Sequence, residues 1–111
     1  MYCMIIYSDI MPRHISSIAF EWDSGNVTKS WLKHGVTKEE CEEAFLNRPL
    51  RVFDDKKHSL NEARFVAYGK TDANKYLTII FTLRFKKTRI ISARKQNRKE
   101  RKTYDKKNTK I

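Results

Sequence analysis

The segment YLTIIFTLRF, from Tyr76 to Phe85, decides the fold because its apolar side chains recur with the two-residue period of a β-strand. Successive side chains of a strand point to opposite faces of a sheet. One face of this strand is therefore predicted to be apolar and to consist of Leu77, Ile79, Phe81 and Leu83. The segment predicts a strand with one buried face.

Further strand segments lie on both sides of this one and are separated from it by short polar turns. The predicted elements are, in chain order, a short strand over Leu50–Phe53, a loop over Asp54–Asn61, a strand over Arg64–Tyr68 that ends at Gly69, a turn over Lys70–Asn74, a turn at Lys86-Lys87 and a strand over Thr88–Arg94. Three strands with such short connections predict an antiparallel meander.

The N-terminal part of the chain predicts one more strand and a short helix. The strand is expected over Ile15–Trp22. Asp23 then stands at the N-cap position of a helix that runs to about Lys33. Gly35 is expected to end this helix, because glycine readily adopts the left-handed conformation found there.

Two later segments also predict helices. Thr37 and Glu40 have the spacing of a capping box, so a second helix is expected to begin there, and Pro49 closes it. Residues Lys95 to about Lys107 contain no Gly or Pro and many Lys, Arg and Glu, which favours a third helix. This helix offers only Tyr104 for burial, so we expect it either to lie on the surface through Tyr104 or to be ordered by a partner.

The length predicts one domain, and the predicted helices and strands place it in the α+β class. Residues 15–107 are expected to form it, with a leader over 1–14 that is either an edge strand or a disordered lead-in, and a tail over 108–111. Cys3 and Cys41 form no CxxC pair, which indicates a reduced, cytoplasmic protein. The apolar N-terminus is too short to span a membrane, which takes about 20 apolar residues.

Almost all of the net charge lies near the C-terminus. The segment Lys86–Ile111 holds 12 basic and 2 acidic residues, a balance of +10 out of the +11 of the whole chain. A block of one sign favours a polyanionic partner, because Lys and Arg that neutralise phosphates release counterions. The charge therefore indicates binding to nucleic acid, and the alternative is a solvated basic tail.

Five short motifs occur in order along the chain and together resemble one family. They are Phe20-Glu21-Trp22-Asp23, Lys33-His34-Gly35-Val36, His58-Ser59-x-x-Glu62-x-Arg64, Ile90-Ile91-Ser92-Ala93-Arg94 and Arg98-x-Glu100-Arg101-x-x-Tyr104. Over Phe20–Tyr104 the chain resembles the BrnT toxins of bacterial type II toxin–antitoxin systems.

The resemblance implies a fold, an activity and a partner. It implies a RelE-like ribonuclease toxin in which two N-terminal helices pack on a small antiparallel sheet, with a basic C-terminal helix. It also implies RNA cleavage without a metal or other cofactor, and growth inhibition. A BrnA-type antitoxin would neutralise the toxin in a heteromeric complex, expected to be a heterotetramer. That complex would bind operator DNA through the antitoxin and repress its own operon.

Four residues are candidates for catalysis of RNA cleavage. His58 is the first candidate for proton transfer, because a histidine pKa is near 6.5 and the adjacent Lys56 and Lys57 oppose protonation. Glu62 and Arg64 are expected on one face of a strand, either as a catalytic pair or as part of an ion pair that only orients the sheet. Arg94, at the end of the last strand, is expected to stabilise charge on the phosphate.

Five further residues are candidates for contact with RNA or phosphate: Lys33, His34, Arg98, Arg101 and Tyr104. Each has a simpler alternative. Lys33 and His34 suit the C-terminal end of a helix, where cations are favoured. Arg98 and Arg101 could be a solvated basic face, and Tyr104 either stacks on a base or holds the helix in place.

No metal ligands are predicted, because His14, His34 and His58 lack ligand spacing and lie apart from the cysteines. Two other functional classes remain open from the sequence. One is a non-catalytic basic module that binds nucleic acid, and the other is an interaction protein whose basic tail docks on an acidic partner.

Overall fold

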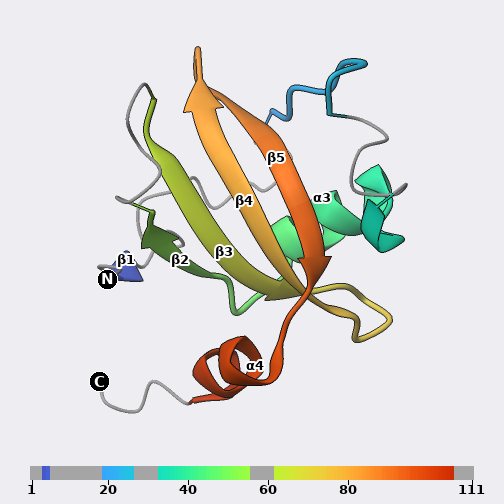
Figure 1. Ribbon diagram of the computed structural model, residues 1–111, viewed down its shortest axis with the longest axis vertical. Helices are drawn as coiled ribbons and strands as arrows, with labels where there is room; N and C mark the ends of the chain where they lie inside the picture. Colours follow the sequence, from blue (N-terminus) through green and yellow to red (C-terminus); the bar gives the residue numbers. More distant parts are fainter. Residues whose placement is uncertain (1–3, 6–18, 27–32, 56–61, 107–111) are drawn as a thin grey trace.

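A computed structural model of the chain describes residues 4–5, 19–26, 33–55 and 62–106, and Figure 1 shows their arrangement. Five strands form one antiparallel sheet, and their spatial order follows the chain order. The elements are β1 (Met4–Ile5), α3 (Lys38–Leu46), β2 (Arg51–Asp54), β3 (Arg64–Lys70), β4 (Tyr76–Arg84), β5 (Lys87–Lys95) and α4 (Arg98–Asp105). The α+β class and the antiparallel meander are thus confirmed.

α3 covers one face of the sheet and builds the main core there. Leu77, Ile79 and Phe81, three of the four side chains predicted to face inward, are fully buried in this core. The fourth, Leu83, lies on the same face of the strand but is 42% exposed. Leu83 belongs to the last residue pairs of the β4–β5 hairpin, which projects beyond α3 in Figure 1.

Gly69 allows α3 to approach the sheet closely. A Cβ at this position would lie 2.5 Å from the carbonyl oxygen of Ala44 in α3, a distance that packing does not tolerate. Gly69 was predicted to end its strand, but β3 continues to Lys70. The residue is therefore a contact point within the strand.

α4 packs on the opposite face of the sheet from α3. Its side chain Tyr104 is 4% exposed and joins a second cluster that contains Phe53, Val66 and Tyr68. The Tyr104 hydroxyl donates a hydrogen bond to the carbonyl oxygen of Pro49 at 2.7 Å. One buried tyrosine thus anchors this otherwise polar helix.

The conformation of Gly35 before α3, the start of α3 and the start of α4 follow from local sequence. The Thr37 capping box is confirmed, and Gly35 has the predicted left-handed conformation with a φ of 70°. A second capping box, between Asn97 and Glu100, starts α4 at Arg98. The helix was predicted to start at Lys95, but that residue still belongs to β5 because it pairs with Leu77.

The turn between β4 and β5 consists of Phe85 and Lys86 and not of Lys86 and Lys87 as predicted. Both residues have positive φ, 51° and 65° respectively. A two-residue hairpin of this kind matches the twist of its strands but favours Asn-Gly, because the left-handed conformation costs other residues about 1–2 kcal/mol each. The side chain of Phe85 is 91% exposed, so burial does not offset this cost.

The N-terminal elements are described in part. The strand expected over Ile15–Trp22 is described only in its last part. There Phe20 forms an isolated parallel bridge with Thr88 of β5. Residues 24–26 form a turn after Asp23, Lys33 and His34 are helical, and the rest of the expected first helix lies outside the described residues. β1 comes from the expected leader, two residues of which thus form an edge strand on β2.

Candidate nucleic-acid interface

Strands β3, β4 and β5 together carry four arginines on the face of the sheet opposite α3. They are Arg64 of β3, Arg84 of β4, and Arg89 and Arg94 of β5, and we refer to them together as the arginine face. Their common orientation follows from the register, since residues directly opposite one another share a face. Arg64 and Arg89 both pair with Thr82, and Arg94 pairs with Thr78.

A bulge in β5 puts Arg89 and Arg94 on the same face. They are five positions apart, and in a regular strand this odd spacing would point them to opposite faces. The register shifts between Ile80 and Phe81, which pair with Ser92 and Ile90 and leave Ile91 without an opposite residue. Such bulges re-aim side chains and are frequent next to active sites.

Arg94 is held in place by Glu100 at the start of α4. Its Nη1 and Nη2 atoms donate to the two carboxylate oxygens of Glu100 at 2.7 and 2.8 Å. Glu100 also accepts hydrogen bonds from the Thr78 hydroxyl and the Asn97 backbone, each at 2.9 Å. Burial acts to raise the pKa of the Glu100 carboxyl, but these bonds together lower it below its ordinary value.

A cleft of about 430 Å³ opens where α4 meets the sheet. Arg94 and Glu100 line it together with Asn97, Lys99 and Thr103, and the apolar wall comes from the strands. The residues of that wall include Phe53, Val66, Tyr68 and Ile80. The cleft therefore combines a fixed guanidinium group with aromatic and aliphatic surface, a combination that suits a nucleotide.

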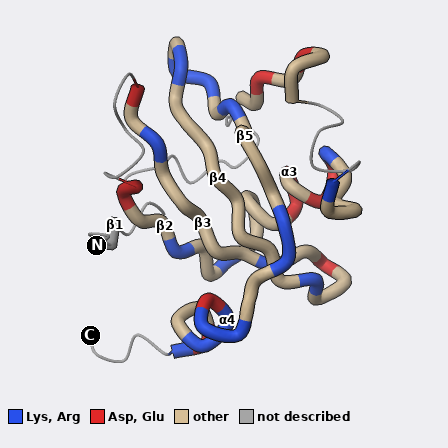
Figure 2. The backbone as a smooth tube through the Cα atoms, in the orientation of Figure 1, with Lys and Arg blue, Asp and Glu red and all other residues tan. Residues whose placement is uncertain are grey.

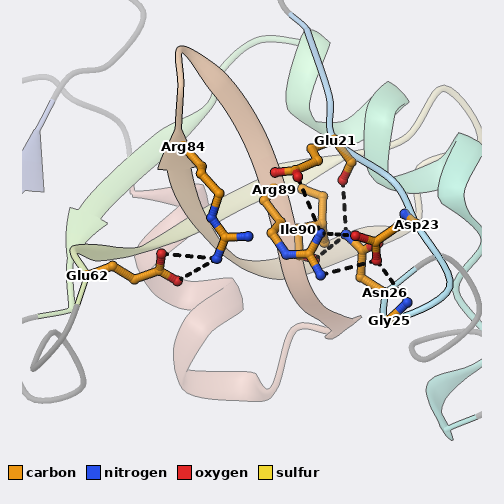
Figure 3. Close-up of polar contacts among 8 residues, drawn as sticks. All are labelled: Glu21, Asp23, Gly25, Asn26, Glu62, Arg84, Arg89 and Ile90. Carbon is orange, nitrogen blue, oxygen red and sulfur yellow. Dashed lines mark hydrogen bonds and ion pairs between the residues drawn. The ribbon is translucent and has the colours of Figure 1, made fainter.

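Two more ion pairs fix the arginines farther along the same face, as Figure 3 shows. Arg84 Nη2 donates to both carboxylate oxygens of Glu62 at 3.2 Å. Arg89 binds the carboxylate of Asp23 at 2.8 and 3.2 Å, with Glu21 at 3.9 Å. The bond from Arg89, with one from the backbone of Gly25, lowers the pKa of the Asp23 carboxyl.

These contacts bear on the predicted pair of Glu62 and Arg64. Glu62 lies two residues before β3 begins, and it bonds across to Arg84 at the end of β4. This contact fits the second interpretation of Glu62 given above, in which an ion pair orients neighbouring strands. Arg64 lies on the arginine face. His58, the candidate for proton transfer, is outside the described residues.

The candidates on α4 have different surroundings. Arg98 and Arg101 are exposed, and the Arg101 guanidinium stacks over the Tyr76 ring at 3.5 Å from its centroid while bonding to Asp105. Tyr104 is buried, so its geometry fits the alternative in which it holds the helix in place. Figure 2 shows the basic residues concentrated along α4, the end of β5 and the β4–β5 turn.

Lys33 and His34 lie on the α3 side of the molecule. Both are exposed, and the next residue, Gly35, accepts a hydrogen bond from Lys75 at 3.2 Å. Lys75 also pairs with Glu40 of α3. Among the residues that the structure describes, no hydrogen bond or ion pair joins Lys33 or His34 to the arginine face.

The structure adds residues that the sequence did not single out. Arg84 and Arg89 have a signal in the sequence, since Arg84 continues the polar face of its strand. The position of Arg89 depends on the bulge, for which the stretch Ile90-Ile91 gives no sequence signal.

Over the described ranges, no helix has the length and apolar character needed to cross a membrane. The same residues include no group of three or more His, Cys, Asp or Glu side chains that could hold a metal ion.

These features define a small α+β domain with a basic sheet face that suits a polyanion. The model of the BrnT family, described as the ribonuclease toxin of type II toxin–antitoxin systems, matches residues 22–100. The chain therefore belongs to the BrnT family and is a toxin of the ribonuclease class. A search of curated protein sequences finds no match to it.

Proposed function

We propose that this protein is a metal-independent endoribonuclease that inhibits growth by cutting RNA on its arginine face. The observation that carries the proposal is the bulge in β5, which brings Arg89 and Arg94 onto the same face as Arg64 and Arg84. Guanidinium groups bind phosphate oxygens in a fixed fork geometry and can stabilise charge that develops on them. Cleavage would proceed by attack of the RNA 2′-hydroxyl on the adjacent phosphorus. The bond from phosphorus to the 5′-oxygen breaks, which leaves a 2′,3′-cyclic phosphate, and the 5′-oxygen takes up a proton to replace the one that the 2′-hydroxyl has lost.

In this proposal Arg94 stabilises the non-bridging oxygens of the scissile phosphate. Its ion pair with Glu100 fixes the direction of the guanidinium before RNA arrives. A guanidinium has five N–H donors, and Nη1 of Arg94 also donates to the carbonyl oxygen of Lys95 at 3.3 Å. Arg64, Arg84 and Arg89 would bind neighbouring phosphates, and His58 would exchange the proton with the 2′-hydroxyl, with Glu62 positioning Arg84.

The C-terminal candidates extend the phosphate-binding surface in this proposal. Arg98 and Arg101 on the exposed side of α4 would hold the RNA backbone beyond the cleft. Tyr104 would act indirectly, by fixing α4 to the sheet through Pro49. Lys33 and His34 would contact RNA that passes around the edge of the sheet.

We further propose a BrnA-type antitoxin as the partner, in the cytoplasm. Membership of a type II toxin–antitoxin family implies an antitoxin. An antitoxin that inhibits by covering the arginine face would present acidic and apolar side chains to it. The complex, proposed as a heterotetramer, would bind operator DNA through the antitoxin and repress its own operon.

The first test uses two variants with the same change of charge on opposite faces. Arg94→Gln removes a cation from the arginine face, whereas Lys95→Gln removes one from its neighbour, which pairs with Leu77 and points to the α3 face. Cleavage of a defined RNA is measured in EDTA, with detection of 2′,3′-cyclic phosphate ends. Loss of one oxyanion-stabilising donor typically lowers the rate by about 10²–10³-fold, so we expect that for Arg94→Gln and less than about threefold for Lys95→Gln.

Equal losses in the two variants would contradict the site and leave only a general effect of charge. His58→Gln, measured in the same assay, tests the proton-transfer role. Thermal unfolding of each variant confirms that it is folded at the temperature of the assay.

A second candidate function is a non-catalytic module that binds nucleic acid. The observation that favours it is that three arginines of the face are engaged by carboxylates: Arg84 by Glu62, Arg89 by Asp23 and Arg94 by Glu100. This module would bind RNA with a steep salt dependence and leave it uncut in the assay above.

A further inference from the structure

Phe85 at the tip of the β4–β5 hairpin is exposed in a way that the fold does not require. Its side chain is 91% exposed, and its backbone is in the left-handed conformation, which is unfavourable for a bulky residue. Asn or Gly would make the same turn without this strain. Strain without a packing contact points to a role of the side chain outside the folded core.

The neighbours of Phe85 indicate the chemistry of what it contacts. Lys86 and Lys87 follow it, and Arg84, which pairs with Glu62, precedes it, so cationic residues stand on both sides of the aromatic residue along the chain. Protein interfaces bury several apolar side chains together and are depleted in lysine. Cations that follow a phosphate backbone, combined with an aromatic ring on which a base stacks, are typical of binding to single-stranded nucleic acid.

The tip also continues the arginine face. Arg84 and Arg89 flank the turn on the two strands of the hairpin. Thr78, which lies opposite Arg94, is seven positions before Phe85, a distance of roughly 23 Å along an extended chain. An RNA strand that lies on the arginine face and extends past Arg84 would therefore reach the tip.

We propose that Phe85 stacks on an unpaired base of the bound RNA while Lys86 and Lys87 contact its phosphates. This inference rests on the proposed function and adds a substrate contact to it, remote from the scissile phosphate. It restricts the substrate to RNA that is single-stranded at this point, because a base within a duplex offers no free face.

The test measures affinity and not cleavage. A fluorescently labelled 2′-O-methyl RNA of about 12 nucleotides is used, because it lacks the attacking hydroxyl and stays intact. Phe85→Asn removes the ring and relieves the backbone strain, so the variant remains folded. We expect its affinity to fall by roughly 5- to 100-fold, the range of one base–aromatic stack, and Phe85→Trp to stay within about threefold of the wild type.

Two controls identify stacking as the cause. On an abasic oligonucleotide of the same length, wild type and Phe85→Asn should bind equally, since no base is left to stack. Removal of the ring should also leave the salt dependence of binding unchanged. Lys86→Gln and Lys87→Gln should each make the negative slope of log affinity against log salt shallower by about 0.7.

An affinity of Phe85→Asn within twofold of the wild type overturns the inference. The same holds if the loss persists on the abasic probe. An unchanged affinity for RNA together with weakened binding of the antitoxin would assign Phe85 to the protein interface instead. If the wild type binds no RNA at all, the proposed function fails as well. Cleavage in EDTA by a Phe85→Asn variant of unchanged affinity means that the inference alone has failed.

Discussion

Glu100 is the residue through which α4 is tied to the sheet, and its replacement by Gln should loosen that helix. The carboxylate receives two hydrogen bonds from Arg94, one from Thr78 and one from the backbone of Asn97. Glutamine keeps one acceptor oxygen, which can serve Thr78 and Asn97. It loses the charge and places an amide N–H group against the guanidinium of Arg94.

The size of the effect follows from the exposure of the two partners. The Glu100 side chain is 14% exposed and that of Arg94 is 38% exposed. A hydrogen bond to a charged group contributes about 1.5–3 kcal/mol, and breaking a fully buried ion pair costs about 3–5 kcal/mol. Because water reaches Arg94 and compensates in part, we expect Glu100→Gln to lower the free energy of unfolding by about 2 kcal/mol. For a domain of this size that corresponds to a fall in Tm of roughly 10 °C.

The assay is urea unfolding followed by circular dichroism, with native-state hydrogen exchange to locate the change. Glu39→Gln is the matched control, since Glu39 lies in the first turn of α3 and is exposed. Its loss should cost less than about 0.5 kcal/mol. Exchange in Glu100→Gln should accelerate first in α4. Equal destabilisation by the two variants, or no difference in α4, would refute the role given to the Arg94–Glu100 pair.

Three more predictions concern packing and titration. Gly69→Ala should lower the free energy of unfolding by about 2 kcal/mol or more in urea unfolding, because its Cβ would meet a backbone carbonyl of α3 at 2.5 Å. The folded-state pKa of Glu100 is lowered from its ordinary 4.5, so its contribution to stability is present above that pH and is lost as pH falls through the folded pKa. Unfolding measured between pH 3 and pH 7 should therefore show a shallower acid loss in Glu100→Gln. Burial raises the pKa of the Cys41 thiol to about 12, so in a Cys3→Ser background a thiol reagent should modify it only as fast as the protein opens.

The features that the sequence predicted well depend on neighbours along the chain. The period of Tyr76–Phe85 specified β4, and the spacing of Thr37 and Glu40 specified the start of α3. The start of α4 was placed too early although Asn97 and Glu100 carry the same capping signal. The residues from Lys95 onward already favour a helix by composition, so the capping signal was overlooked. Helix propensity carries no information on how far strand pairing continues.

The features that the sequence did not predict depend on register between strands. The bulge at Ile91 has no local signature, yet it decides that Arg89 and Arg94 share a face. The turn at Phe85 contradicts the usual preference for Asn-Gly, so composition placed it one residue too late. The partner of Glu62 is Arg84, 22 residues away along the chain, and only the pairing of β3 with β4 brings the two together.

The ion pairs of the arginine face reduce the repulsion between like charges that would otherwise destabilise the fold. A balance of +10 in the last 26 residues is self-repelling. On the sheet, Asp23 and Glu21 reduce that repulsion at Arg89, and Glu100 reduces it at Arg94. The same bonds orient the guanidinium groups, so less ordering remains to be done when a phosphate arrives. Stability and RNA binding are therefore coupled at Arg94. Its replacement should lower both, whereas replacement of Lys95, one residue away on the other face, should lower neither appreciably.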